Sequence, residues 1–151
     1  CSAAPLRIGA PMGARKSGAT MSEAGFVTLL AALAGGAGAV ARYLVDSAIM
    51  LRVARNARAA TFPYGTWVVN LSGSLLIGAV AGSVSSLHPL AAVLGVGLLG
   101  GYTTFSAASY ETIQLLRRGR VFVGFLNGVG QLCCAVGLAT AGFGLGSLIA
   151  F

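Results

Sequence analysis

The chain has 151 residues, of which 56% are hydrophobic and only 9% are charged, and its formal net charge at pH 7 is +7. This composition excludes an ordinary soluble domain and is typical of a membrane protein, with length enough for about four spanning helices. The 23 glycines agree with that interpretation, because small residues allow helices in the bilayer to approach closely. The basic residues lie in short clusters without an accompanying aromatic face, so we expect no nucleic-acid partner.

The chain opens with residues 1–20, which are polar, small and basic and lack the apolar centre of a signal peptide. We expect them to lie outside the fold, as a disordered tail or an upstream extension preceding Met21. Residues 21–151 then form a single all-α membrane domain. Its apolar runs predict four transmembrane helices joined by short loops, over about 25–50, 66–84, 90–116 and 121–149.

The first two spans each carry polar side chains in an apolar setting. In the first, Arg42 and Asp46 are four residues apart and share one helix face. Charged groups in the bilayer are costly, so we expect this pair to have a functional or structural role. In the second, Asn70 of the segment WVVNLSGS is either a bridge between helices or an anion donor.

The third span contains GGYTTFSAASYET, residues 100–112. Two glycines followed by two β-branched threonines favour local unwinding, which would free carbonyls for a small cation. The alternative is close helix packing, with the threonine hydroxyls bonded to their own helix. Phe105 is either an ordinary apolar residue or an electropositive ring edge facing an anion. Glu111 is either a cation partner or an interfacial carboxylate.

The fourth span carries Asn127 and Gln131, which lie one helical turn apart. Three spans therefore offer uncharged polar groups, and together they suggest a narrow path for something small. We find no constellation of enzyme residues: no Ser, His and acid set, no Cys or His ligand cluster and no phosphate loop. The sequence predicts that the protein is not an enzyme.

The loops after the first and third spans hold six arginines, and the connection after the second span and the C-terminus hold none. These arginines are Arg52, Arg55, Arg58, Arg117, Arg118 and Arg120. The positive-inside rule places both loops in the cytoplasm and both termini outside. We therefore predict one fixed orientation, in the plasma or inner membrane.

Three segments of the chain resemble the signature motifs of the Fluc (CrcB) family of fluoride channels, in the same order and spacing. They are GGAGAVARY, PYGTWVVNLSGSLLIG and GGYTTFSAASYET. The resemblance implies a four-helix subunit whose third helix is broken mid-membrane. It also implies an antiparallel, dual-topology dimer with pores at the interface, through which fluoride leaves the cell passively.

The resemblance also implies roles for single residues. Asn70 aligns with the family's pore-lining Asn, and Phe105 with the Phe whose ring edge contacts the anion. Backbone carbonyls of Gly100 and Thr103 align with those that hold a central structural Na⁺. Two further positions of the family pattern are taken by Arg42 and Glu111, as polar support. The polar groups that we assign to the ion path beside Asn70 and Phe105 are Thr104, Ser106, Ser109, Asn127 and Gln131.

The chain departs from the family pattern at two places. Ala108 stands where a second Phe is expected, and Asn127 and Gln131 replace the usual Tyr and Ser of the fourth span. With the one-sided charge bias, these changes favour a heterodimer with an oppositely oriented homologue over a homodimer. Two alternatives remain: a proton-coupled small-anion exporter using Glu111, Asp46 or His88, and a noncatalytic subunit that supports a competent partner.

Overall fold

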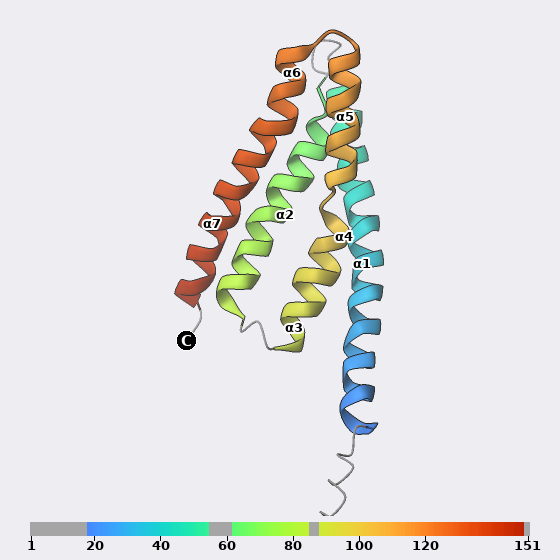
Figure 1. Cartoon of the computed structure of the whole chain (residues 1–151), viewed down its shortest axis with the longest axis vertical. Coiled ribbons are helices and arrows are strands. Elements are labelled where there is room, and N and C mark those ends of the chain that lie inside the picture. The colour runs from blue at the N-terminus through green and yellow to red at the C-terminus, as the bar shows by residue number, and fades with distance from the viewer. Residues whose placement is uncertain (1–17, 55–61, 85–87, 150–151) are drawn as a thin grey trace, which may run out of the picture.

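The computed structural model describes residues 18–54, 62–84 and 88–149, which are almost entirely helical (Figure 1). The helices are α1 (Gly18–Val53), α2 (Tyr64–Ser83), α3 (Pro89–Ala91), the π-helix η2 (Ala92–Leu99), α4 (Gly100–Tyr102), α5 (Phe105–Arg117), α6 (Val121–Phe125), the π-helix η3 (Leu126–Gly130) and α7 (Gln131–Ile149). The expectation for residues 1–17 lies outside the described residues. Residues 18–20, expected to precede the fold, instead begin α1.

Four helical stretches are long and apolar enough to cross a membrane, which confirms the four predicted spans. They cover Glu23–Val53, Tyr64–Ser83, Pro89–Arg117 and Val121–Ile149. Successive stretches run in opposite directions, so the C-terminal ends of α1 and α5 lie at one end of the bundle (Figure 1). Arg52 and Arg117, in the last turns of these two helices, and Arg118, directly after α5, are consequently gathered at that end.

The polarity of the bundle is the reverse of that of a soluble domain. Large apolar side chains cover its outside, as with Phe122, which is 78% exposed, and Leu148, which is 77% exposed. The buried side chains include the polar residues Thr66, Asn127 and Gln131. In hydrocarbon such groups need partners inside the protein. Polar contacts between helices therefore help to hold this bundle together.

Two facing pairs of glycines bring α2 and α7 into backbone contact. A Cβ added at Gly78 or Gly82 of α2 would collide with the backbone of α7. A Cβ added at Gly142 or Gly146 of α7 would collide with the backbone of α2. Each pair has the small-xxx-small spacing that suits close packing of helices in membranes. Glycine is thus required at these positions because there is no room for a Cβ atom, and not because the backbone needs the conformational freedom of glycine.

The first and third spans pack in the same way. A Cβ at Gly38 of α1 would meet the Leu98 carbonyl, and one at Gly101 would meet the carbonyl of Gly35. Gly97 of η2 likewise lies against the backbone of Ala31. These contacts fix the first half of the third span firmly against α1.

The third span is interrupted between α4 and α5, as predicted. Thr103 (φ −77°, ψ 159°) and Thr104 (φ −147°, ψ 120°) are extended. The predicted cause was partly wrong, because Gly100 and Gly101 remain helical in α4. Gly101 instead serves the contact with α1, while the two β-branched threonines adopt the extended backbone that suits such residues. The segment is therefore unwound at the two threonines and closely packed at Gly101.

Candidate functional site

Asn70, near the middle of α2, is bonded to the break in the third span. Its Nδ2 donates to the Thr104 carbonyl at 2.8 Å, and its Oδ1 accepts from the Thr104 N–H at 2.8 Å. In a continuous helix this N–H would donate to the carbonyl of Gly100. The Asn70 amide thus satisfies backbone groups that the break would otherwise leave unpaired in the bilayer.

Thr104 begins the second half of the span. Its Oγ1 accepts from the Ala107 N–H at 3.2 Å, which caps the N-terminus of α5, and lies 3.2 Å from Ser106 Oγ. The Ala107 N–H would otherwise donate to the Thr103 carbonyl. The carbonyls of Gly100 and Thr103 therefore both lose their usual helical donors at the break.

Further contacts from α2 hold the residues just before the break. The Tyr102 hydroxyl lies 3.1 Å from Ser72 Oγ. A Cβ at Gly73 would collide with the methyl of Thr103 and approach the ring of Tyr102 to 3.1 Å. The segment of α2 from Asn70 to Gly73 thus contacts every residue from Tyr102 to Thr104, and it positions the break within one subunit.

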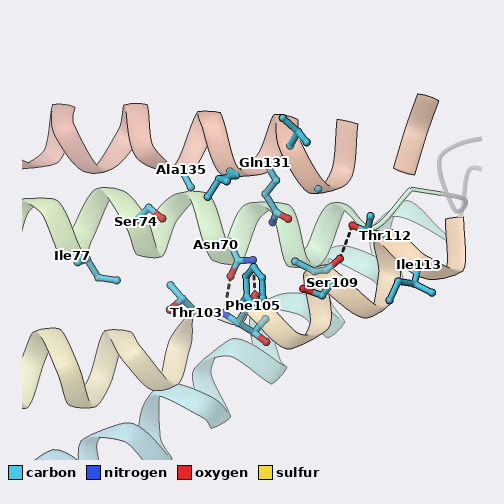
Figure 2. Close-up of a pocket in the computed structure, with 15 residues that line it drawn as sticks. Asn70, Ser74, Ile77, Thr103, Phe105, Ser109, Thr112, Ile113, Gln131 and Ala135 are labelled. Atoms are coloured by element: carbon cyan, nitrogen blue, oxygen red, sulfur yellow. Dashed lines mark hydrogen bonds between the residues drawn. The ribbon is translucent and has the colours of Figure 1, made fainter. Parts of the chain in front are cut away.

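An open groove of about 530 Å³ runs between α2, α5 and the fourth span (Figure 2). Its lining is Asn70, Ser74, Ile77, Thr103, Thr104, Phe105, Ala108, Ser109, Thr112, Ile113, Gly128, Val129, Gln131, Leu132 and Ala135. Phe105 is the first residue of α5 and is 84% exposed on this side of the bundle. The groove therefore presents amides, hydroxyls and an aromatic ring within apolar walls.

The groove brings together five of the seven residues assigned to the ion path, namely Asn70, Thr104, Phe105, Ser109 and Gln131. Ser106 is exposed beside Thr104 and is not part of the lining. Ser74 lines the groove although the sequence analysis did not single it out. The available signal was its spacing: Ser74 follows Asn70 by four residues and therefore lies on the same helix face.

Asn127 is placed inside the bundle, away from the groove lining. It is 0% exposed, and its Oδ1 accepts from Trp67 Nε1 at 2.9 Å. Its Nδ2 approaches the Ala108 carbonyl at 3.2 Å and Thr112 Oγ1 at 2.9 Å. The amide thus connects α2, α5 and η3, and its donors and acceptor are occupied by the protein.

Gln131, the first residue of α7, lines the groove and is 4% exposed. Its Nε2 donates to the Thr66 carbonyl at 3.2 Å. Ala108 also lines the groove, so the position at which the family pattern places a second Phe does face it. A small side chain there leaves the groove wider beside Phe105.

Glu111 lies on another face of α5. Its Oε1 accepts from Thr66 Oγ1 at 2.6 Å, whereas its Oε2 is buried without a hydrogen-bond partner. Together with Gln114 and Arg118 it lines a separate cavity of about 280 Å³ near the arginine-bearing end. Of the two interpretations of Glu111, the interfacial one agrees better with this position.

Arg42 and Asp46 form no ion pair in the part of the chain that the structure describes. The Arg42 Nε is buried without a hydrogen-bond partner. The Asp46 carboxylate lies instead against the backbone of Gly65 at the start of α2, where an added Cβ would collide with it. The two residues share a helix face as predicted, but Asp46 is directed to another helix.

The sequence matches the family model described as CrcB-like protein, Camphor Resistance (CrcB), over residues 29–143. It is 41% identical over 126 residues to the fluoride-specific ion channel FluC 1 of Leifsonia xyli subsp. xyli, covering 81% of this chain and 88% of that protein. It is 42% identical over 120 residues to the fluoride-specific ion channel FluC of Solibacter usitatus, covering 77% and 93% respectively. With FluC of Shewanella frigidimarina it shares 47% identity over 102 residues, which are 66% of this chain and 78% of the relative.

Proposed function

The chain belongs to the CrcB family, and on that premise we propose that it conducts fluoride passively out of the cell. The members of this family include fluoride-specific ion channels, and it is a family of channels, not of enzymes. One observation carries this proposal: Asn70 and Phe105 line the same open groove at the break in the third span (Figure 2). The protein crosses the membrane several times, and we place it in the plasma or inner membrane.

The chemistry of the groove suits a small, strongly hydrated anion. The Asn70 Nδ2 carries two protons, and the Thr104 carbonyl takes one of them. The second proton is available to an ion, and the edge of the Phe105 ring is electropositive. Fluoride that has lost its water needs strong, fixed donors, and the bonds to Thr104 hold this amide in place.

The open side of the groove supports a dimer with pores at its interface. Phe105 is 84% exposed in the single subunit, and the groove beside it is partly open. A partner subunit would close the groove into a pore and exclude lipid from it. An oppositely oriented partner is what the resemblance to the fluoride channels implies.

We further propose that this partner is an oppositely oriented homologue, with a homodimer as the other possibility. The bias of the arginine-bearing loops predicts a single orientation for this chain, whereas an antiparallel homodimer requires two. Ala108 widens the groove where a second ring is expected. An aromatic residue of the partner would take the place of the ring that is missing at position 108.

We also propose that a structural Na⁺ lies at the centre of the dimer and that membrane lipid surrounds the dimer. The carbonyls of Gly100 and Thr103 fit such an ion, because the break deprives both of their helical donors. Oxygen ligands of this kind suit a hard cation, and a bound sodium ion would supply positive charge shared between carbonyls of the two subunits. Removal of Na⁺ should therefore weaken the dimer.

A fluoride-electrode assay on liposomes tests the function. We expect rapid, downhill fluoride efflux that does not respond to a proton gradient, from this chain alone or with a co-expressed homologue. Uphill transport driven by a pH difference would establish the proton-coupled exporter instead. Efflux that needs the homologue but survives loss of Asn70 and Phe105 from this chain would establish a noncatalytic subunit.

A further inference from the structure

Five hydroxyl groups line the groove, and they differ in their hydrogen bonding. Thr103 Oγ1 donates to the Leu99 carbonyl at 3.0 Å, and Thr112 Oγ1 donates to the Ala108 carbonyl at 2.8 Å. Thr104 Oγ1 caps α5. Ser74 and Ser109 have no hydrogen-bond partner among the described residues, so their protons are available to a ligand in the groove.

The hydroxyl of Ser74 differs from those of the other serines of α2, because it has no hydrogen-bond partner among the described residues. Ser and Thr inside helices usually donate to a carbonyl one turn earlier. Two other serines of α2 follow this pattern, Ser72 to the Val68 carbonyl at 2.6 Å and Ser83 to the Val80 carbonyl at 3.5 Å. Ser74 does not, although a partly buried hydroxyl in an apolar wall gains from a partner.

The position of Ser74 extends the row of donors along the groove. In Figure 2, Ser74 and Ser109 lie on opposite sides of Asn70, with Ser109 toward the arginine-bearing end of the bundle. Ser74 is one helical turn from Asn70 on the same face of α2. An ion released by Asn70 toward the other end of the groove therefore meets Ser74 next.

We propose that Ser74 is a fluoride-binding residue of the ion path, on the side of Asn70 away from the arginines. The inference rests on the proposed function and adds a residue to it. A hydroxyl is a single, rotatable donor that can follow a moving anion. Conduction requires several such sites, each weak enough to release the ion to the next. Ser109, Asn70 and Ser74 would form that series.

The first test compares Ser74→Ala with Ser83→Ala in fluoride efflux from liposomes. Ser83 is on the same helix but its hydroxyl is used by the Val80 carbonyl, and it does not line the groove. We expect Ser74→Ala to lower the efflux rate by about tenfold or more, as for loss of one hydrogen bond to a charged group, and Ser83→Ala to leave it unchanged. Equal rates for the two variants would overturn the proposal.

The second test measures access of water to position 74 and does not depend on fluoride flux. With Cys1, Cys133 and Cys134 replaced by alanine, Ser74→Cys and Leu76→Cys are treated with a small charged thiol reagent in liposomes. Leu76 is 49% exposed but lies outside the groove lining. Thiols react as thiolates, which form in water and not in hydrocarbon. We expect rapid labelling at position 74 only, with loss of efflux.

The two tests separate this inference from the proposed function. If the parent protein carries no fluoride but position 74 is labelled, the proposed function fails, and the placement of Ser74 on a wet path stands. If the parent conducts and position 74 is unreactive, the inference is wrong and the function stands. Labelling with an unchanged Ser74→Ala rate would remove Ser74 from the donors.

Discussion

The side-chain amide of Asn70 pairs with the main chain of Thr104 at both of its ends, with two bonds of 2.8 Å. Helix α2 thereby supplies hydrogen-bond partners to backbone groups of the third span that have lost their helical partners at the break. The same amide keeps one proton that Thr104 does not use, and Asn70 lines the groove. Support of the break and a place in the groove lining thus meet in one side chain.

Asn70→Asp should abolish fluoride efflux even if the fold survives. A carboxylate can still accept from the Thr104 N–H, but it cannot donate to the Thr104 carbonyl, and its charge repels an anion. We expect at least about a tenfold loss in the liposome assay, as for loss of a hydrogen bond to a charged group. Val68→Ala, at a position of α2 outside the groove lining, is the control. An unchanged rate in Asn70→Asp would remove Asn70 from the path.

Phe105→Ile should lower efflux while the dimer persists, because isoleucine keeps the apolar bulk and loses the ring edge. Phe122→Ile is a matched control. Phe105 is 84% exposed and Phe122 is 78% exposed, yet only Phe105 lines the groove. The measurement is the efflux rate, with size-exclusion chromatography for the dimer. Similar losses in both variants would indicate a general effect of replacing exposed rings.

Gly142→Ala should destabilise the subunit, because the added Cβ would collide with the backbone of Leu75. Forcing one methyl group into closely packed helices costs about 1–3 kcal/mol. Gly144→Ala, two residues along α7, meets nothing within 4 Å and should be neutral or slightly stabilising. Unfolding in a denaturing detergent gives both values. Equal stability of the two variants would contradict close contact between α2 and α7.

Asn127→Leu should destabilise the protein by about 1–3 kcal/mol, since it leaves the part-buried Trp67 Nε1 without an acceptor. Trp67 is the only tryptophan of the chain, so its fluorescence reports the change directly. A double-mutant cycle with Trp67→Phe, in which unfolding is followed by circular dichroism because that variant lacks tryptophan, should give non-additive unfolding energies. If Asn127→Leu were as stable as the parent but failed to conduct, Asn127 would belong to the ion path after all.

A reporter fused to the C-terminus should be found outside the cytoplasm. The arginines at the ends of α1 and α5 lie at one end of the bundle, whereas α7 ends at the other (Figure 1). Paired fusions of alkaline phosphatase, active outside, and green fluorescent protein, fluorescent inside, measure this. Replacing Arg117, Arg118 and Arg120 with glutamine should produce mixed orientations. A cytoplasmic C-terminus in the parent would contradict the predicted topology.

Much of the fold could be read from local sequence. The four spans follow from the length and hydropathy of apolar runs, and the break follows from the adjacent threonines in an otherwise apolar helix. The exact role of Gly101 could not be predicted, because glycine favours both unwinding and close contact. Only the position of Gly35 on α1, opposite Gly101, decides that it serves contact.

Of the site, sequence pattern and resemblance singled out Asn70 and Phe105 but could not separate Asn127 from Ser74. Both are uncharged polar residues in apolar spans, each one helical turn from another polar residue, and nothing in the local sequence marks one as a bridge and the other as a donor. Asn127 lies within reach of Trp67 and Thr112, which come from two other helices. Ser74 faces open space in the groove.

By itself, the sequence determined that this is a four-span member of the CrcB family, approximately where its four spans lie, and which residue types lie in the bilayer. These properties depend on composition and short-range spacing. The tertiary structure alone decided which polar groups are satisfied and which remain free, because a hydrogen bond depends on the distance between side chains of different helices. In hydrocarbon that distinction is decisive: a paired amide such as Asn127 holds the bundle together, and an unpaired hydroxyl such as Ser74 is left for a ligand.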